Sequence, residues 1–530
     1  MHLVRATSVV CLCALASAQA PGLRLFQAIG NELTSLVDTS GNIVHTWPNG
    51  GNLTAHLLPD GSLLRGVQTG AIVVPGATGR LERLAYDGTL LWSYTIGGPF
   101  SYMHHDIEPM PNGNVLVIAW DRYAYADAIA NGRDPALITS ADWLPDSILE
   151  IQPTGPTTAN IVWEWHMMDH VIQDFDNTKA NYGPVASHPE LLDINYPAEI
   201  LTDGDWNHFN GLDYDPVNDW IVFSARPMSE IYIIDHSTTT AEAAGHTGGT
   251  HGKGGDFLWR WGNPAAYRST PVLNHQLTHQ HDPRFVPPGY PGAGHVTVFD
   301  NEYLPAQSAA VEITLPIDIN GHLVLDPSGQ FGPAAAQVIY TDPGFVSLFV
   351  SSVERMPNGN TLICSGLQNT LFEVDSNGTA LWAYNHPTST MIFQAHYVER
   401  SLWNDTDMLS AGGGQVDFDH LTGSSFGGEF YLLLGSISGT SPGTTLGSVT
   451  LPLNQDYLTF AMATLFNTGV FSHTIGTLGT NGDAASSIIV GPGYVPQALV
   501  GTDMHFAHVI FNHSLAIVRA SNAVKVTITP

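Results

Sequence analysis

An internal repeat constrains this 530-residue chain more than any other feature. Its unit is an apolar hairpin with a turn signal inside it, followed by a second hairpin that has a Trp or Tyr near its end. The clearest copy runs through residues 353–363 and 371–384, and other copies start near residues 53, 101, 206 and 279. Each copy predicts about four strands, a unit that cannot bury its faces without neighbours.

A further copy is divided between the two ends of the repeat region. Residues 392–398 have the form of a first strand, and residues 36–47 have the form of a second hairpin. Pairing the two segments would close a ring and cover its edge strands. We therefore expect an all-β fold with a six-bladed β-propeller closed by the N-terminal strands; five or seven blades are the alternatives.

The N-terminus has the features of a secretory signal peptide, which we place at residues 1–20. Arg5 is followed by an apolar run over residues 9–16 and by the small-residue cleavage site Ala18-Gln-Ala20. We expect the product to be secreted, periplasmic or bound at the cell surface.

The remaining chain divides into a propeller domain at residues 21–405, a linker at 406–425 and a β-sandwich accessory domain at 426–530. The linker is assigned from its Gly, Asp and Ser content, and the sandwich from short, evenly spaced strand candidates. Insertions at residues 122–146 and 166–204 are too long for ordinary connections.

Charge and cysteine content restrict the partners. The chain has 17 Lys and Arg against 48 Asp and Glu, a formal net charge of -31. Such a surface argues against nucleic acid and anionic membranes as partners, and no later run reaches the ~18 apolar residues of a membrane span. Without the signal peptide, only Cys364 remains, so an intrachain disulfide is excluded.

Three histidines occupy equivalent places before the first strands of three repeats: His105, His208 and His281. In a propeller these strands line the central channel, so the imidazoles should meet at one channel mouth. Arg226 ends the strand that pairs with the one after His208, and an antiparallel hairpin brings the two residues together. A single histidine is more often structural, whereas three in register predict a site.

Such a site suits group transfer on an anionic ester. A neutral imidazole is a nucleophile, a second imidazole can act as acid or base, and Arg226 can neutralise charge on the transferred group. Histidines can also bind a transition metal, with Asp106 and Asp282 as outer partners. Because Arg226 would oppose a dication, we expect no metal and no cofactor.

The motifs that surround these residues resemble the bacterial arylsulfate sulfotransferase family, whose members do not use PAPS. The matching segments are residues 104–107, 111–114, 205–208, 224–226, 280–285 and 352–362. The resemblance covers about residues 30–400 and leaves the C-terminal part outside. It implies a six-bladed propeller that moves a sulfuryl group from an aryl sulfate ester to a phenolic acceptor through a sulfohistidine.

Carried onto this sequence, the resemblance places the nucleophile on His281. It places sulfate binding and proton handling on His208, Arg226 and one histidine of the pair His104 and His105. We favour His105, because it precedes an Asp as His281 does. The other polar residues are assigned to substrate binding: His104, Asn210 and His279.

Two other functions compete with sulfuryl transfer. One is a non-catalytic secreted propeller that binds a glycan or a protein, which the weakly charged surface and the added sandwich would suit. The other is a metal-dependent hydrolase in the same channel. The identities of donor and acceptor and the oligomeric state do not follow from the sequence.

Overall fold

A computed structural model describes residues 19–530, except 21, 31–32, 49, 51, 59–60, 71–73, 87, 99, 197–203, 270–274, 326–329, 389, 400, 423–425, 441–442, 448 and 481. The predicted signal peptide therefore lies almost entirely outside the described residues.

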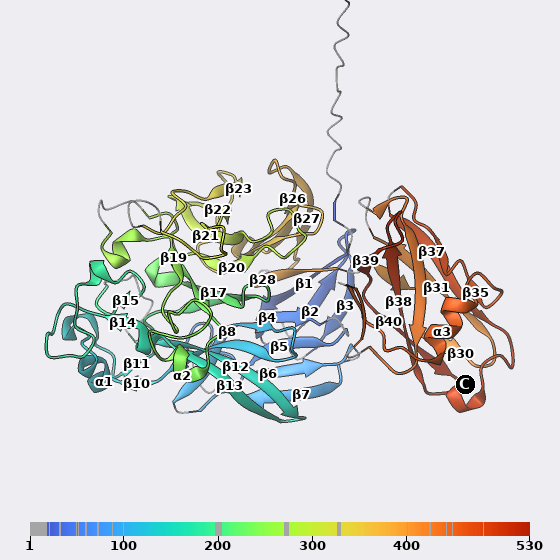
Figure 1. Ribbon diagram of the computed structural model, residues 1–530, viewed down its shortest axis with the longest axis horizontal. Coiled ribbons are helices and arrows are strands. Elements are labelled where there is room, and N and C mark those ends of the chain that lie inside the picture. Colours follow the sequence, from blue (N-terminus) through green and yellow to red (C-terminus); the bar gives the residue numbers. More distant parts are fainter. Residues whose placement is uncertain are drawn as a thin grey trace, which may run out of the picture.

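Six antiparallel sheets of four strands account for most of the chain up to residue 398 (Figure 1). Starting from the inner strand, the first three sheets are β4 (Asn52–Leu57), β5 (Leu63–Gln68), β6 (Gly79–Leu84) and β7 (Leu90–Thr95); β8 (Ser101–Pro109), β9 (Val115–Asp121), β12 (Asp146–Gly155) and β13 (Thr158–His166); and β16 (Phe209–Asp215), β17 (Trp220–Ala225), β18 (Glu230–Asp235) and β19 (Trp259–Trp261). The others are β20 (His281–Phe285), β21 (Val296–Leu304), β22 (Gln307–Ile313) and β23 (Gln337–Thr341); β24 (Ser352–Arg355), β25 (Thr361–Ser365), β26 (Thr370–Val374) and β27 (Ala380–Asn385); and β28 (Met391–Val398), β1 (Leu23–Ile29), β2 (Thr34–Val37) and β3 (Ile43–Trp47). The repeat therefore predicted the four-stranded units correctly.

The inner strands of the six sheets contact one another in order. Each of β4, β8, β16, β20, β24 and β28 contacts the next, and β28 contacts β4. Each pair of neighbouring sheets also shares a hydrophobic cluster, as where Trp220 and Ile231 pack with Val296. The sheets are thus stacked in a propeller-like arrangement, with both faces of every sheet covered.

The two ends of the repeat region pair as the sequence predicts. Strand β1 lies antiparallel to β28, with Leu25 opposite His396 and Phe26 opposite Ala395. Successive side chains of a strand point to opposite faces, so Leu25 enters one inter-sheet cluster and Phe26 the other. The N-terminal strands therefore complete the sheet that β28 begins.

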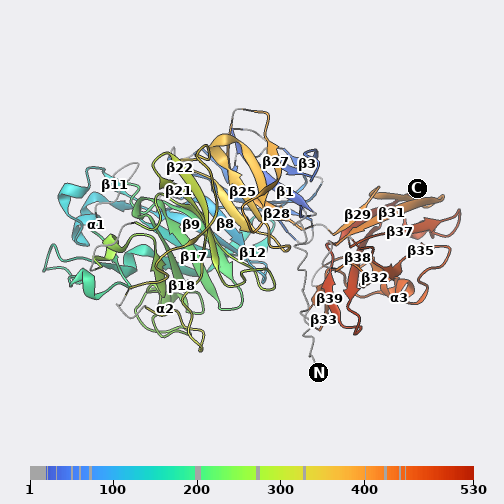
Figure 2. The same cartoon turned by 90° about the horizontal axis from the view of Figure 1, so that it is seen from above.

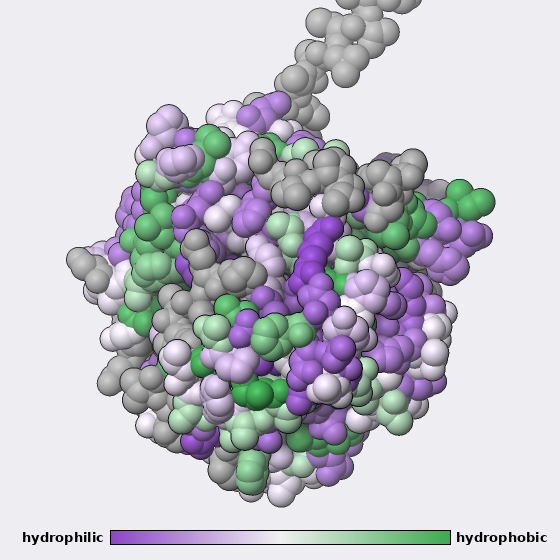
Figure 3. All heavy atoms as spheres, turned by 90° about the vertical axis from the view of Figure 1, so that its left-hand side faces the viewer, coloured by the Kyte–Doolittle hydropathy of each residue, from purple (hydrophilic) through white to green (hydrophobic). Residues whose placement is uncertain are grey.

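The two insertions are packed parts of the fold. They contain β10 (Tyr123–Ala124), α1 (Tyr125–Ala130), β11 (Asp142–Trp143), β14 (Val171–Ile172) and β15 (Leu192–Asp193). Their residues Trp143 and Leu192 join a cluster with Leu212 and Phe223. They lie at the end of the molecule opposite the C-terminal strands (Figures 1 and 2). Seen from that end, polar and apolar residues are intermixed (Figure 3).

Two further sheets form the C-terminal part beside β1 to β3 (Figures 1 and 2). They share one hydrophobic cluster that includes Phe418, Leu433 and Ile488. One sheet contains β29 (Leu402–Asn404), β31 (Gly414–Leu421), β37 (Asp483–Val490) and β35 (Phe471–Ser472); the other contains β30 (Met408–Ser410), β40 (Val524–Thr529), β38 (Asp503–Phe511), β32 (Phe430–Ser436) and β36 (Ile475–Thr477), with β39 (Ile517–Ala520) on β38. A hairpin of β33 (Thr444–Leu446) and β34 (Val449–Leu451) and the helix α3 (Tyr457–Thr464) accompany them.

The predicted linker at residues 406–425 is wrong in its bounds. Strand β31 pairs along its whole length with β37, and β30 pairs with β40. Ser410 and Gly414 therefore lie in strands of the C-terminal sheets, and the change from the first six sheets to the C-terminal sheets falls between β28 and β29.

Candidate functional site

Three of the predicted histidines meet where the inner strands β8, β16 and β20 approach one another. The rings of His105 and His208 have centroids 4.5 Å apart. The rings of His105 and His281 both lie near Phe393 of β28, at centroid distances of 5.8 and 6.3 Å. All three histidines are buried, and Arg226 is half-buried beside them. Burial lowers the pKa of His105 and His281, and the charge of Arg226 lowers both further, for His105 after the effects of the neighbouring histidines.

Local backbone geometry turns His105 toward this cluster. Strand β8 has a bulge between His104 and Ile107, and His105 is left-handed with φ 47°. Gly76 covers the ring, because a β-carbon on Gly76 would lie 1.9 Å from His105 Cε1. A regular strand would have turned His104 and His105 to opposite faces.

His104 lies behind His105, where its side chain contacts protein groups. The two Nδ1 atoms are 2.7 Å apart, and His104 Nε2 is 2.8 Å from Asp146 Oδ1. The His104 ring is fully buried and stacks on Trp120 at 3.8 Å. Both of its nitrogens therefore face protein groups, and its position suits orientation of His105.

His208 forms a buried pair with Asp205. His208 Nδ1 is 2.5 Å from Asp205 Oδ2, and the other carboxylate oxygen accepts a hydrogen bond from Trp120 Nε1 at 2.9 Å. Because a carboxylate only accepts, Nδ1 carries a hydrogen and Nε2 is the atom left to exchange a proton.

His281 is a neutral imidazole held by Asn301. Nδ1 donates to Asn301 Oδ1 at 2.7 Å, and the Asn301 amide is fixed by donating to the carbonyls of Ser347 and Val350. This arrangement leaves the lone pair on Nε2, which accepts a 3.2 Å hydrogen bond from the Val350 N–H. Burial, with the charge of Arg226 next, lowers the pKa of His281 to about 3.

Arg226 lies where the hairpin prediction put it, because Ala225 at the end of β17 is opposite Phe209. The two other predicted substrate-binding residues contact protein groups instead. Asn210 is buried and donates to the Gln280 carbonyl at 2.9 Å, which fixes the backbone before His281. His279 pairs with Glu302 at 2.6 Å.

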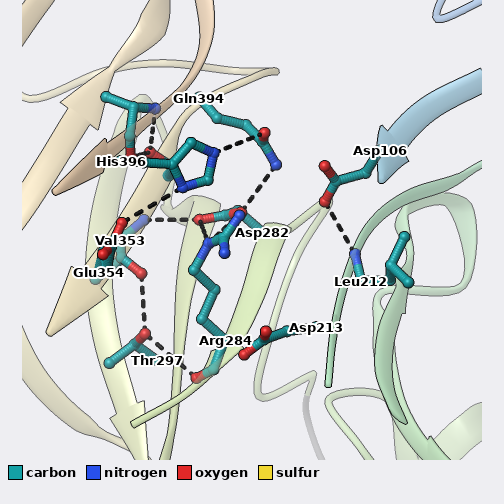
Figure 4. Close-up of polar contacts among 12 residues, drawn as sticks. Asp106, Leu212, Asp213, Asp282, Arg284, Thr297, Val353, Glu354, Gln394 and His396 are labelled. Carbon is teal, nitrogen blue, oxygen red and sulfur yellow. Dashed lines mark hydrogen bonds and ion pairs between the residues drawn. The ribbon is translucent and has the colours of Figure 1, made fainter. Parts of the chain in front are cut away.

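Side chains of several inner strands form an ion cluster around Arg284 (Figure 4). Arg284 Nε donates to both oxygens of Asp282, at 2.9 and 3.1 Å. Four more carboxylates from other inner strands surround it: Asp106, Glu108, Asp213 and Glu354. Burial raises the pKa of Asp106 to about 6 and of Asp213 and Glu354 to about 7. One guanidinium thus faces five carboxyl groups, some of which hold protons near neutral pH.

Asp282 belongs to this cluster, although regular strand alternation after His281 would turn it to the opposite face. The strand has a bulge between His281 and Arg284, and Asp282 has φ 55°. Its carboxylate accepts from Gln394 Nε2 at 3.1 Å and from the Val353 N–H at 3.2 Å, both on other inner strands.

Sequence reasoning missed three residues of the site: Asp205, Asn301 and Phe393. Asp205 stands three residues before His208, a spacing at which a partner could be suspected. Asn301 and Phe393 come from β21 and β28 and have no motif of their own. A pocket of about 340 Å³ lies elsewhere, between Pro291, Glu312 and Arg355, and no residue of the histidine cluster lines it.

Comparison with known proteins gives one family and several distant folds. The family model Arylsulfotransferase (ASST) matches residues 14–314. No curated protein matches the chain. Solved structures with some similarity include a Bacteroides caccae protein of unknown function (13% identity, 71% of this chain and 98% of that one, TM-score 0.39). They also include a periplasmic gluconolactonase of Pseudomonas aeruginosa (10%, 71% and 99%, 0.35) and a Staphylococcus aureus virginiamycin B lyase (11%, 70% and 86%, 0.32). Scores this low carry no functional argument.

Proposed function

This chain belongs to the arylsulfotransferase family, and we propose that it transfers a sulfuryl group from an aryl sulfate ester to a phenolic acceptor through a sulfohistidine on His281. The observation that carries the proposal is the meeting of a neutral His281, the Asp205–His208 pair and Arg226 at one place. That set supplies a nucleophile, a proton carrier and a cation.

In the first step His281 Nε2 gives up its hydrogen bond from the Val350 N–H. It then forms a bond to sulfur as the bond from sulfur to the aryl oxygen breaks. His208, protonated at Nε2, gives its proton to the leaving phenolate. In the second step the acceptor oxygen attacks sulfur, the N–S bond breaks, and His208 takes the phenolic proton. His281 keeps its hydrogen bond to Asn301 throughout, so His281 needs no other proton transfer.

Arg226 neutralises the sulfuryl oxygens, and His105 accompanies His208 in proton handling. A planar guanidinium can donate two parallel hydrogen bonds to such a group. In the chain from Asp146 through His104 to His105, a proton on His104 Nε2 facing the carboxylate would make His104 Nδ1 the acceptor. His105 would then keep its hydrogen on Nδ1 and its lone pair on Nε2.

We further propose that the six sheets form a closed six-bladed propeller over residues 21–399, with the C-terminal sheets as an accessory domain. The ring of contacts among inner strands and the pairing of β1 with β28 support it. Export by a cleaved signal peptide is also part of the proposal, with small aryl sulfates and phenols as partners. Every helix in the described part of the chain falls short of what a membrane crossing needs.

The test is capture of the intermediate. We expect the intact mass of the protein to rise by one sulfuryl group after brief exposure to p-nitrophenyl sulfate alone and a quench at high pH, because an N–S bond of this kind is labile to acid. The adduct should be absent in His281→Asn and present in the neighbouring control His279→Asn. An adduct that persists in His281→Asn would overturn the nucleophile assignment, and the absence of turnover with any aryl sulfate would favour a binding protein.

A further inference from the structure

A second cluster of histidines, which the proposed reaction does not use, lies between the insertion that follows β13 and the segment that joins β18 to β19. His170 ends the short helix Met167–His170, His246 follows the helix α2 (Thr240–Ala243), and Asp256 precedes β19. The Nδ1 atoms of His170 and His246 lie 2.9 and 2.8 Å from the same oxygen, Asp256 Oδ1. One ligand atom from each residue lies within 4.8 Å of the others.

The hydrogen bonds of His170 show that a cation belongs between His170 and Asp256. His170 Nε2 lies 2.8 Å from the Ala243 carbonyl oxygen, which can only accept, so Nε2 carries the hydrogen. In a neutral imidazole Nδ1 then holds a lone pair, and this lone pair faces a carboxylate oxygen. Because His170 Nδ1 and Asp256 Oδ1 would both be acceptors and lie 2.9 Å apart, a cation must lie between them, either a second proton or a metal ion.

The surroundings hold His170 firmly in this orientation. The ring is fully buried and stacks on Trp165, with a centroid distance of 5.1 Å and an interplanar angle of 2°. Trp165 Nε1 donates to the Gly255 carbonyl at 2.8 Å. A β-carbon on Gly255 would lie 2.6 Å from His170 Nε2 and 2.1 Å from the Ala243 carbonyl oxygen, so only glycine allows this close approach.

We propose that His170, His246 and Asp256 bind a divalent transition-metal ion of the zinc class. Two imidazole nitrogens and one carboxylate oxygen are donors that zinc accepts at about 2.0–2.2 Å, which separates neighbouring donors by roughly 3.3 Å. Each Nδ1 atom therefore needs to move away from the Asp256 oxygen by only about half an ångström, and the two nitrogens already lie within 4.8 Å of each other. The carbonyl that holds His170 Nε2 is the outer partner that a metal-binding histidine usually has.

The site is open on one side, and none of its three ligands is a residue of the proposed sulfuryl transfer. The His246 side chain is 60% exposed, so water can complete the coordination. The metal would link the insertion that follows β13 to the segment between β18 and β19. Its role is therefore to stabilise these segments. The sequence had suggested a metal only at the channel histidines, and this inference does not depend on the proposed function.

The experiment measures Zn²⁺ and Co²⁺ binding to the full-length mature protein, without a polyhistidine tag, after chelator treatment and dialysis. We expect one equivalent of Zn²⁺ by titration calorimetry and elemental analysis, and visible absorption bands with Co²⁺ from a site of low coordination number. His246→Gln should weaken binding by more than about 100-fold, beyond the loss typical of an outer-shell residue. Zn²⁺ should raise the melting temperature of the wild type and leave that of His246→Gln unchanged.

Two further variants keep the result interpretable. Asp256→Asn should also lose the metal, whereas His513→Gln should keep it, because His513 pairs with Glu429 at 3.0 Å on the surface of the sandwich. His246 is exposed, so its variant should fold. No binding by the folded wild type, or one equivalent that survives in both His246→Gln and Asp256→Asn, would overturn the proposal in favour of a proton shared by His170 and Asp256.

Discussion

At the scale of single residues, Arg226 is the cation assigned to the transferred group. We predict that Arg226→Lys lowers kcat/KM by roughly 100-fold or more. This loss is typical when an enzyme loses one hydrogen-bond donor directed at the charge that develops in the transition state. Lysine keeps the charge, but it cannot make two parallel hydrogen bonds. Initial rates with p-nitrophenyl sulfate and phenol test this, together with an unchanged circular dichroism spectrum. Near-wild-type rates would remove Arg226 from the site.

Asp205 is the partner that orients His208, and its substitution tests the proton carrier. In Asp205→Asn the amide oxygen can still accept from Trp120, while the amide nitrogen faces His208 Nδ1. The hydrogen then moves to His208 Nε2, which is the wrong tautomer for a base. We expect kcat to fall by about 10²–10⁴, the range of general acid–base catalysis.

The matched control for this substitution is Asp219→Asn. Asp219 makes a similar contact, 2.7 Å from His236 Nδ1, outside the cluster. Asp219→Asn should leave kcat within about twofold of the wild type, since substitutions on the surface away from the site rarely affect stability or activity. Equal losses in both variants would show that Asp205 acts through folding and not through His208.

How well single residues could be predicted depended on backbone regularity. The hairpin rule placed Arg226 beside His208 because Phe209 and Ala225 are paired. The directions of the His104 and His105 side chains depend on the bulge in β8, and this bulge has no sequence signature. Asn301 and Phe393 reach the site only through the stacking of sheets, so no local pattern indicates them.

At the scale of elements, carboxylates join several inner strands to their neighbours. Asp106 accepts from the Leu212 N–H, Asp213 from that of Phe285, and Glu354 from that of Tyr397. The sequence showed acidic residues on these strands, but not that their side chains bond across neighbouring sheets. The bulges in β8 and β20 turn some of them inward against strict alternation.

The ion cluster around Arg284 predicts that stability depends on pH, and Glu354→Gln should reveal this dependence. Burial raises the pKa of Glu354 from 4.5 to about 7, so its contribution to stability is full below pH 4.5 and is lost as pH rises through about 7. Glutamine can still accept from Tyr397 N–H and does not ionise. The variant should therefore gain stability relative to the wild type between pH 5 and 8.

The size of that gain follows from the pKa shift. At about 1.4 kcal/mol per pKa unit the full effect is about 3 kcal/mol. The side chain is 23% exposed, and solvent screening reduces the effect, so we expect roughly 1–2 kcal/mol. Urea unfolding at pH 5, 6.5 and 8 measures it. A difference in unfolding free energy that stays constant across these values would contradict the raised pKa.

At the scale of the whole molecule, the repeat allowed the six sheets to be predicted, because each unit carries its own turns and apolar alternation. The boundary near residue 400 was missed, since Gly and Ser serve equally in linkers and in turns between short strands. The insertions lacked any period, and their packing depends on residues such as Trp143 and Leu192 meeting Leu212.

Two truncations test how the molecule is assembled. Deletion of residues 21–48 removes β1, β2 and β3 and exposes β28 together with the face of β4 and β5, so we expect an aggregated product.

A chain that ends at Glu399 keeps all six sheets and loses only the C-terminal strands. Among the residues that it loses is Trp403, which packs against the cluster containing Leu23 and Leu25. This second product should stay monodisperse in size-exclusion chromatography and keep kcat within about threefold, because no residue of the histidine cluster lies beyond Phe393. A soluble, active product of the first deletion would refute ring closure by the N-terminal strands. Loss of activity in the second, with folding intact by circular dichroism, would mean that the C-terminal sheets take part in the reaction and are no accessory domain.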